Sequence, residues 1–424
     1  MSVIQSSGSN LATPKSLRLQ VGIFGRTNVG KSSFLNMLAN QDIALVSEIP
    51  GTTTDIVEKA MEFHPIGPVN FLDTAGINDV SALSAKRIDK TSSVFERAEI
   101  AVLVVEPNVF GEFEQQIVET FRKNKIPFLI VVNKTDISEP DYGFMQKLEA
   151  ISPALSAVSS TNREKREIYV NSVIKSLTKV LPSGYLQKTS ILGDLIKPGD
   201  LVVLICPIDS EAPKGRLIMP QVQSIRDILD NNSVSIVVKE TEYPYILGQL
   251  GKEPSLVVCD SQVVDLMVKN TPSHIKCTTF SILFSRFKGD MLEDIRGAAA
   301  IDRLKDGDKV LIAEACTHHP SEDDIGRAKI PRWLRNYSNK SISIEVAAGR
   351  DYPSNLDEYA AIIHCGACML TRHEKMTRIQ KAKQLSIPIS NYGIVISLLH
   401  NALERVLEPF PEALQLYKQL KETN

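Results

Sequence analysis

The sequence is poor in cysteine and aromatic residues, and neither sign of charge is in excess. Its 424 residues include six cysteines, seven histidines and one tryptophan, and the formal net charge is −2. A surface that binds nucleic acid normally appears as a strong basic excess with interleaved aromatic residues. The composition therefore argues against a nucleic-acid partner.

Long apolar runs are absent as well. No run approaches the roughly 20 residues that a helix needs to span a bilayer. The N-terminal stretch Met1 to Ser16 is rich in serine and asparagine and lacks the apolar core of a signal peptide. We expect no membrane association and a cytoplasmic location, where thiols stay reduced and disulfides do not form.

What the sequence does contain is an alternation of strand-like and helix-like segments, which predicts an α/β fold. A chain of this length is expected to form two to four domains. We expect a flexible N-terminus at residues 1–16, a first domain at 17–182, a small middle domain at 186–271 and a last domain at 272–424.

The first domain begins with a phosphate-binding loop. The apolar segment Leu17 to Phe24 runs into the pattern G-x-x-x-x-G-K-S, formed by Gly25, Arg26, Thr27, Asn28, Val29, Gly30, Lys31 and Ser32, with Ser33 next. Such a loop between a strand and a helix surrounds phosphates with backbone N–H groups. We expect Lys31 to bind the β- and γ-phosphates and Ser32 to bind Mg²⁺.

Two further motifs are expected to contact the metal ion and the γ-phosphate. Asp73-Thr74-Ala75-Gly76 follows the predicted strand Val69 to Leu72. Asp73 is placed to reach Mg²⁺ through water, and the Gly76 N–H to sense the γ-phosphate. Thr54 closes a run of three threonines and is our candidate for a second Mg²⁺ ligand in the triphosphate state.

A fourth motif is expected to recognise the base. Asn133-Lys134-Thr135-Asp136 follows the predicted strand Phe128 to Val132. The Asp136 carboxylate can accept the N1–H and N2–H₂ groups of guanine, whereas adenine has an acceptor at N1, so guanine is favoured. Ser156 and Ala157 are candidates for the loop beneath the base.

These four motifs, in this order, resemble the Era/TrmE group of GTPases. The resemblance implies a P-loop GTPase domain with a doubly wound sheet, and hydrolysis of GTP with Lys31, Asn28, Thr54 and Gly76 as catalytic groups. Ile77 stands where many signalling GTPases carry a glutamine. Asn28 matches the asparagine that binds an activating K⁺ in TrmE-like members; a loop-stabilising amide is the alternative.

The middle domain shows strands but no catalytic motif. Cys206 and Cys259 lie at the ends of predicted strands, and we interpret them as inert core thiols. A domain that adds a sheet without chemistry predicts a dimerisation module, with two-fold symmetry. A plain spacer is the alternative.

The other notable feature is a group of cysteines and histidines in the last domain. Cys316 and His318 follow the predicted strand Lys309 to Ala313, and His364-Cys365-Gly366-Ala367-Cys368 follows Tyr359 to Ile363. Ligands gather at the carboxyl ends of strands in open α/β sheets, and thiolates with imidazoles favour soft metals. A cluster held by three cysteines is the preferred interpretation, with structural zinc, a redox pair and buried free thiols as alternatives.

The Cys-x-His and His-Cys-x-x-Cys motifs behind a TrmE-like GTPase domain resemble the HydF family of FeFe-hydrogenase maturation GTPases. The resemblance implies a homodimer in which Cys316, Cys365 and Cys368 hold a 4Fe-4S cluster, so that the last domain is an iron-sulfur domain. The fourth iron position stays open, and the candidate ligands are His318, His364, Glu322 and Asp323.

The same resemblance implies a carrier. It would receive a diiron precursor bearing CO and cyanide, built with the radical-SAM partners HydE and HydG, and deliver it to apo-hydrogenase, with GTP as a timing signal. One rival interpretation is a GTPase of RNA modification or ribosome assembly with a structural zinc domain. Another is a metallochaperone for a single nickel or zinc ion.

Overall fold

The protein forms two compact units, residues 1–188 and residues 189–424, and both are mixed α/β as predicted. The computed structural model describes residues 15–39, 57–73, 94–182, 185, 190–208, 217–315, 324–349, 352–353, 355–366 and 370–422. Within these ranges, no helix is both long and apolar enough to cross a membrane.

The first unit is built on a six-stranded sheet in the order β2-β3-β1-β4-β5-β6, parallel except that β2 runs antiparallel to β3. Its described strands are β1 (Leu19–Phe24), β2 (Val57–Phe63), β3 (Gly67–Asp73), β4 (Ile100–Val105), β5 (Phe128–Val132) and β6 (Leu155–Ala157). Its described helices are η1 (Lys15–Leu17), α1 (Lys31–Ala39), α3 (Glu112–Lys123), α4 (Tyr142–Ile151) and α5 (Arg166–Val180).

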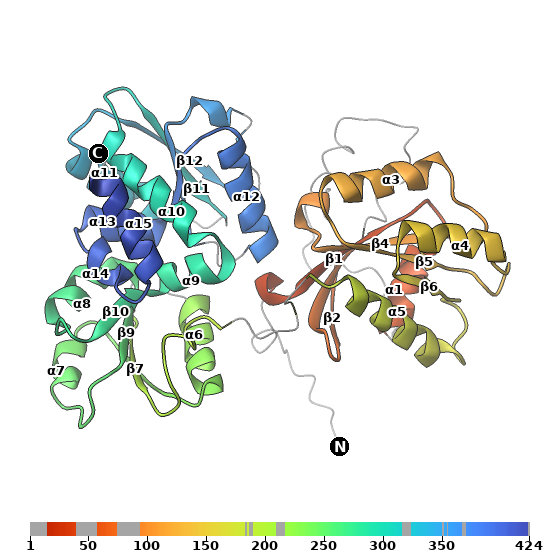
Figure 1. Ribbon diagram of the computed structural model, residues 1–424, viewed down its shortest axis with the longest axis horizontal. Coiled ribbons are helices and arrows are strands. Elements are labelled where there is room, and N and C mark those ends of the chain that lie inside the picture. The colour runs from red at the N-terminus through yellow and green to blue at the C-terminus, as the bar shows by residue number, and fades with distance from the viewer. Residues whose placement is uncertain are drawn as a thin grey trace, which may run out of the picture. The chain divides into compact units, whose positions relative to one another are not determined.

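Helices cover both faces of this sheet (Figure 1). Helices α1 and α5 contribute to the core on one face, through residues such as Phe34 and Leu177. Helices α3 and α4 contribute Phe121 and Leu148 to the core on the other face. Because both faces are covered, the central strands are apolar at nearly every position, which is why the sequence shows them as unbroken runs.

The second unit contains two four-stranded parallel sheets. The first has the order β10-β9-β7-β8. Its strands are β7 (Leu201–Ile205), β8 (Val234–Val238), β9 (Leu256–Cys259) and β10 (Lys276–Thr279), and its helices are α6 (Met219–Asp230), α7 (Tyr243–Leu247), η2 (Ser261–Val263) and α8 (Val264–Asn270). Strand β10 lies after the predicted boundary at Thr271, and that boundary stays a prediction.

The second sheet of this unit has the order β12-β11-β13-β14. Its strands are β11 (Lys309–Glu314), β12 (Ser343–Ala348), β13 (Ala361–His364) and β14 (Ile389–Asn391). The helical elements are α9 (Phe280–Lys288), α10 (Met291–Ala299), η3 (Ala300–Arg303), η4 (Ile325–Lys329), α11 (Ile330–Ser338), η5 (Leu356–Glu358), α12 (Arg372–Gln384), α13 (Tyr392–Leu399), α14 (Leu403–Leu407) and α15 (Pro411–Glu422).

In the second sheet, α12 covers one face, and α10, α11 and α13 lie on the other (Figure 1). A single hydrophobic core joins this second face to the sheet of β7 to β10. The predicted dimerisation and cluster domains therefore fold here as one unit with a shared core.

Most predicted strands lie within one or two residues of their observed positions. The strand predicted to begin at Leu17 begins at Leu19, because residues 15–17 form a 3₁₀ turn. The strand predicted to end at Ile363 extends to His364, so that His364 is its last residue and is buried. The helical stretch Phe280 to Leu304 is divided at Gly289, after which Asp290 caps α10 by accepting a hydrogen bond from the Glu293 N–H.

Candidate functional sites at the carboxyl ends of two sheets

Both groups of predicted site residues lie where the strand order of a sheet reverses. In the first sheet, β1 lies between β3 and β4, and the phosphate-binding loop follows β1. In the second sheet of the other unit, β12 lies on one side of β11 while β13 and β14 lie on the other. Loops that leave two such neighbouring strands in opposite directions open a crevice between them, and ligands bind there.

The phosphate-binding loop requires glycine at both ends. Gly25 has φ of 145°, and a Cβ atom there would lie 2.3 Å from the Val104 carbonyl oxygen. Gly30 has φ of 91°, and its Cβ would lie 2.4 Å from the Asn133 side-chain nitrogen. Asn28, between them, is exposed in the left-handed region with φ of 64°. The glycines therefore allow this loop to approach strand β4 and the Asn133 motif closely.

Lys31 and Asp73 come together at the end of the sheet, and Ser32 follows Lys31 in the first turn of α1. The Lys31 ammonium donates to the carbonyl oxygens of Gly25 and Arg26 at 2.8 Å and 2.7 Å, and Lys31 is 5% exposed. Burial lowers the pKa of Lys31, and the negative charge of Asp73 opposes that shift. Asp73 is the buried last residue of β3 and lies in register with Ile23 of β1. A cationic and an anionic group thus meet where a phosphate and a metal ion are expected.

Arg26 forms an ion pair with Glu114 that the sequence did not predict. Its guanidinium donates to the two Glu114 oxygens at 2.6 Å and 2.9 Å. Burial raises the pKa of Glu114, but the hydrogen bonds from Arg26 and the Gly111 N–H together leave it below its ordinary value. The pair joins the loop to the first turn of α3.

Asn133 links the predicted base motif to the phosphate-binding loop. Its side-chain nitrogen donates to the Val29 carbonyl oxygen at 3.0 Å. Its side-chain oxygen accepts from the Ser160 hydroxyl at 2.7 Å and the Ser160 N–H at 3.1 Å. Asp136 is exposed and accepts from Thr161 at 3.1 Å, while hydrogen bonds from Ser159 and Thr161 lower its pKa. An exposed, ionised carboxylate suits the recognition of two donors on a base.

Ser156 and Ala157, which were predicted to lie beneath the base, are the last two residues of strand β6 and precede the residues that contact the base motif. Both belong to β6, and the Ser156 hydroxyl lies in the core, 2.8 Å from the Ser176 hydroxyl of α5. The residues that contact the base motif follow β6: the Val158 carbonyl oxygen accepts from the Thr135 N–H, and Ser159 to Thr161 contact Asn133 or Asp136. These residues were not predicted; the serines at 159 and 160 are the sequence signal that could have indicated them.

Of the three predicted cluster cysteines, Cys365 lies within the described residues. The Cys365 sulfur accepts a hydrogen bond from the Ala315 N–H at 3.2 Å, and the Cys365 N–H donates to the Ala313 carbonyl oxygen at 3.0 Å. Cys365 also packs with Ala315 and Leu370 in one small apolar cluster. Ala315 immediately precedes Cys316 in the sequence, and Leu370 follows Cys368 by two residues. Cys365 therefore contacts residues that are close in sequence to the other two predicted cluster cysteines, Cys316 and Cys368, which themselves lie outside the described residues.

His364 uses both ring nitrogens within the protein. Nε2 lies 2.9 Å from the Arg378 guanidinium, and Nδ1 lies 2.6 Å from the Cys365 carbonyl oxygen. Arginine has only donors, so Nε2 accepts and Nδ1 carries the proton. Burial, reinforced by the positive charges of Arg378 and Lys375, lowers the pKa of His364 to about 3. His364 is thus a neutral hydrogen-bonding group in this structure.

Several predicted residues lie outside the described parts of the chain. They are Thr54, Gly76, Ile77, Cys316, His318, Glu322, Asp323 and Cys368. Within the described parts, no three His, Cys, Asp or Glu side chains form a metal-binding group. The cysteine assignments and the fourth ligand therefore stay predictions.

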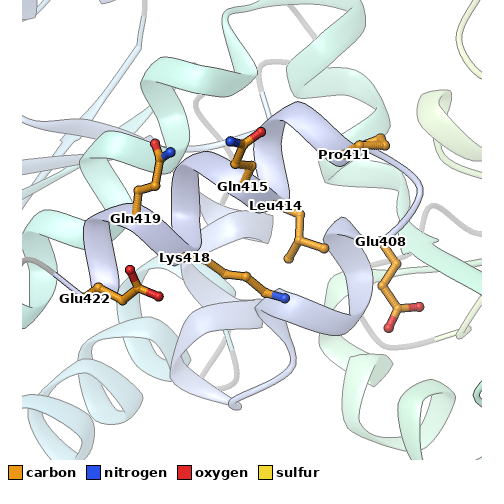
Figure 2. Close-up of a pocket in the computed structure, with 7 residues that line it drawn as sticks. All are labelled: Glu408, Pro411, Leu414, Gln415, Lys418, Gln419 and Glu422. Atoms are coloured by element: carbon orange, nitrogen blue, oxygen red, sulfur yellow. The ribbon is translucent and has the colours of Figure 1, made fainter.

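A surface hollow of about 510 Å³ lies along one side of α15, and none of its lining residues is a predicted site residue. Figure 2 shows these residues, which are Glu408, Pro411, Leu414, Gln415, Lys418, Gln419 and Glu422. Apart from Glu408, all of them belong to the exposed side of one amphipathic helix, and they supply no group suited to a nucleotide or a soft metal.

Three family descriptions match successive parts of the chain. Residues 20–134 match a 50S ribosome-binding GTPase, residues 191–289 match a hydrogen maturase F dimerization domain, and residues 292–409 match a hydrogen maturase F tetramerization domain. The predicted P-loop GTPase domain and dimerisation domain are thereby confirmed. A role of the last domain in forming tetramers was not predicted.

Curated relatives match the first unit. GTPase Der of Campylobacter hominis is 37% identical over 133 residues, which are 30% of this chain and 29% of that protein. The tRNA modification GTPase MnmE of Nitrosospira multiformis is 36% identical over 120 residues, 28% of this chain and 26% of that protein. The chain thus spans less than a third of the length of these two relatives.

Two solved structures align with part of the chain. The G domain of the T. maritima FeoB iron transporter is 20% identical, covers 38% of this chain and 99% of that chain, and has a TM-score of 0.30. Aquifex aeolicus Era bound to GDP·AlF₄⁻ is 18% identical, covers 55% of this chain and 98% of that chain, and has a TM-score of 0.32.

Ser160→Ala should weaken the affinity for GDP. It removes the hydroxyl that holds the Asn133 side chain, and a hydrogen bond of this kind contributes about 0.5–1.5 kcal/mol, or roughly two- to twelvefold in affinity. Fluorescence titration with a labelled GDP measures the change. Thr120→Ala, which removes an exposed hydroxyl bonded within α3, is the control, and equal affinities for both variants would contradict the role of Ser160.

Proposed function

The chain belongs to the hydrogen maturase F family, and from this premise we propose that it is a FeFe-hydrogenase maturation GTPase that acts as a carrier. It holds a 4Fe-4S cluster, receives a diiron precursor from reactions involving HydE and HydG, and transfers it to apo-hydrogenase. The observation that supports the proposal is the hydrogen bond from the N–H of Ala315, the residue before Cys316 in the sequence, to the Cys365 sulfur, at the reversal of strand order between β11 and β13.

The first unit binds and hydrolyses GTP in this proposal. Lys31 contacts the β- and γ-phosphates, Ser32 and Asp73 hold Mg²⁺, and Asp136 selects guanine. Asn28, exposed in the phosphate-binding loop, holds a K⁺ that neutralises charge between the phosphates as an arginine finger would. Equal hydrolysis rates in potassium and sodium buffers would remove K⁺ from this mechanism.

The residues around Cys365 fit an iron-sulfur cluster. Three thiolates are suitable ligands for iron, and the N–H of Ala315 directed at the Cys365 sulfur is the kind of hydrogen bond that surrounds cluster thiolates. When bound, a cluster with three thiolates leaves one iron with an exchangeable ligand, which can hold and release cargo. Cys316, Cys365 and Cys368 would supply the three thiolates. Hydrogen bonds at its backbone N–H, its carbonyl oxygen and its sulfur hold Cys365 in place.

His364 is better suited to position Cys365 than to bind the fourth iron. Its Nε2 would have to give up the hydrogen bond with Arg378 before it could bind a metal. The remaining candidates from the sequence are His318, Glu322 and Asp323, and nothing in the described residues ranks them.

Anaerobic reconstitution of the full chain with iron and sulfide tests this proposal. We expect about four irons per chain and a reducible EPR signal, both lost in Cys365→Ala. Cys206→Ala is a matched control, because burial raises the pKa of the Cys206 thiol to about 12 and leaves it an inert core group. One tightly bound zinc per chain and no EPR-active cluster would contradict the proposal and favour the RNA-assembly GTPase with a structural zinc domain.

The oligomer surface proposed here is strand β8 with the adjoining helix α6. β8 is an outer strand of its sheet, and Val234 and Val237 are 54% and 41% exposed. Val222 and Leu229 of α6 are exposed as well. An outer strand with exposed apolar residues readily pairs with another chain, and this one lies within the match to a dimerization domain. A second copy of the chain would bind here about a two-fold axis.

Val237→Asp should therefore reduce dimer formation, because it places a charge in the apolar contact. Light scattering after size-exclusion chromatography measures the mass of the assembly. Ile168→Asp is the control, since Ile168 is an exposed apolar residue of α5 in the first unit. An unchanged mass for a folded Val237→Asp variant would place the interface elsewhere.

A further inference from the structure

Glu114 is a buried carboxylate in the first turn of α3, and no sequence motif predicted a role for it. It is 2% exposed, and glutamate is almost never buried to this degree unless it is paired. Its two oxygens accept from the Arg26 guanidinium at 2.6 Å and 2.9 Å, and the second also accepts from the Gly111 N–H at 2.8 Å. These bonds lead to the phosphate-binding loop and to the start of the helix that carries Glu114.

Arg26 is fixed at both its side chain and its backbone. Its guanidinium lies 5.4 Å from the centre of the Phe113 ring, in addition to its bonds with Glu114. Its carbonyl oxygen accepts from the Lys31 ammonium at 2.7 Å. Because this carbonyl is part of the loop, a contact that fixes the Arg26 side chain also restrains the loop beside Lys31.

The other half of the loop has an anchor of its own. The Asn133 side chain donates to the Val29 carbonyl oxygen at 3.0 Å. The two glycines of the loop, Gly25 and Gly30, lose the most conformational freedom when the backbone becomes ordered. Contacts that order a loop before its ligand arrives reduce the entropy that binding costs. Glu114 and Asn133 therefore hold the loop from two sides, through residues that are distant from it in the sequence.

We propose that Glu114 is a positioning residue for GTP, which acts through Arg26 to hold the phosphate-binding loop in the conformation that surrounds the phosphates. The inference requires the GTPase activity and does not depend on the cluster or the carrier role. Because the loop is ordered before GTP arrives, Glu114 stabilises the bound substrate and the transition state equally. Such uniform binding lowers KM and leaves kcat unchanged.

The sign of the effect separates positioning from simple electrostatics. Glu114 carries a negative charge, and removal of a negative charge near an anion-binding loop would by itself strengthen the binding of phosphates. Loss of a positioning contact weakens it. Glu114→Gln distinguishes the two, because glutamine at the third position of a helix still accepts a hydrogen bond from the residue before the helix, here Gly111, but cannot form the charged pair with Arg26.

The test compares full-length wild type, Glu114→Gln and the matched control Glu112→Gln. Glu112 is an exposed residue of the same helical turn, so the control removes the same charge close to the same place. We measure kcat and KM for GTP hydrolysis, the Kd of a labelled GDP and the thermal unfolding midpoint. For Glu114→Gln we expect KM and Kd to rise roughly three- to tenfold with kcat unchanged, and for Glu112→Gln we expect the wild-type values.

Unchanged or tighter GDP binding by Glu114→Gln would overturn the inference, as would a fall in kcat at an unchanged KM. A lower unfolding midpoint with wild-type KM and Kd would show that Glu114 serves stability alone. If Glu114→Gln does not fold, Arg26→Gln decides, because it removes the same pair from its exposed side, and wild-type KM and Kd for that variant would overturn the inference.

The double variant tests whether Glu114 acts through Arg26. Residues that act as one unit show effects that do not add. We therefore expect Arg26→Gln combined with Glu114→Gln to bind GDP as Arg26→Gln alone does. A further loss of affinity in the double variant, equal to that of Glu114→Gln in the wild type, would contradict a role through Arg26.

Discussion

The structure depends on one geometric constraint, which is that parallel strands end together at one edge of their sheet. Where the strand order reverses, the loops after two neighbouring strands separate and leave space between them. Predicted site residues lie at such a reversal of strand order in each of the two units. Lys31 and Asp73 meet in the first unit, and Cys365 meets the residue before Cys316 in the second. The apolar strands beneath each site are rigid and buried, so they fix the positions from which these side chains extend.

In the sheet of β7 to β10, residues of the protein itself pack at the point where the strand order reverses. Its order also reverses, between β7 and β9. There the Ser261 hydroxyl donates to Ser281 of α9 at 3.0 Å, and a Cβ atom on Gly393 of α13 would lie 2.0 Å from Ser281. Cys206, Cys259 and Cys277 end up buried in this region, and burial raises the pKa of each thiol. Burial thus distinguishes these three thiols from Cys365, which is partly exposed.

Motifs and strand positions could be predicted because each follows from local rules. Gly25 and Gly30 are required by backbone geometry, and buried parallel strands appear as apolar runs. The contacts of Arg26 with Glu114, of Asn133 with Ser160 and of Arg378 with His364 join residues far apart in the sequence, and no local pattern reveals them. α12 is largely polar, so a helical pattern of apolar residues gave no indication that Lys375 and Arg378 face inward.

In the proposed function, GTP acts as a timing signal for a carrier and does not drive the cargo chemistry. A ligand changes docking only by the difference in its affinity for two states. The most direct test is the affinity of the full chain for apo-hydrogenase, measured with GDP and with a non-hydrolysable GTP analogue. We expect two clearly different affinities, and identical affinities would show that the bound nucleotide does not control docking.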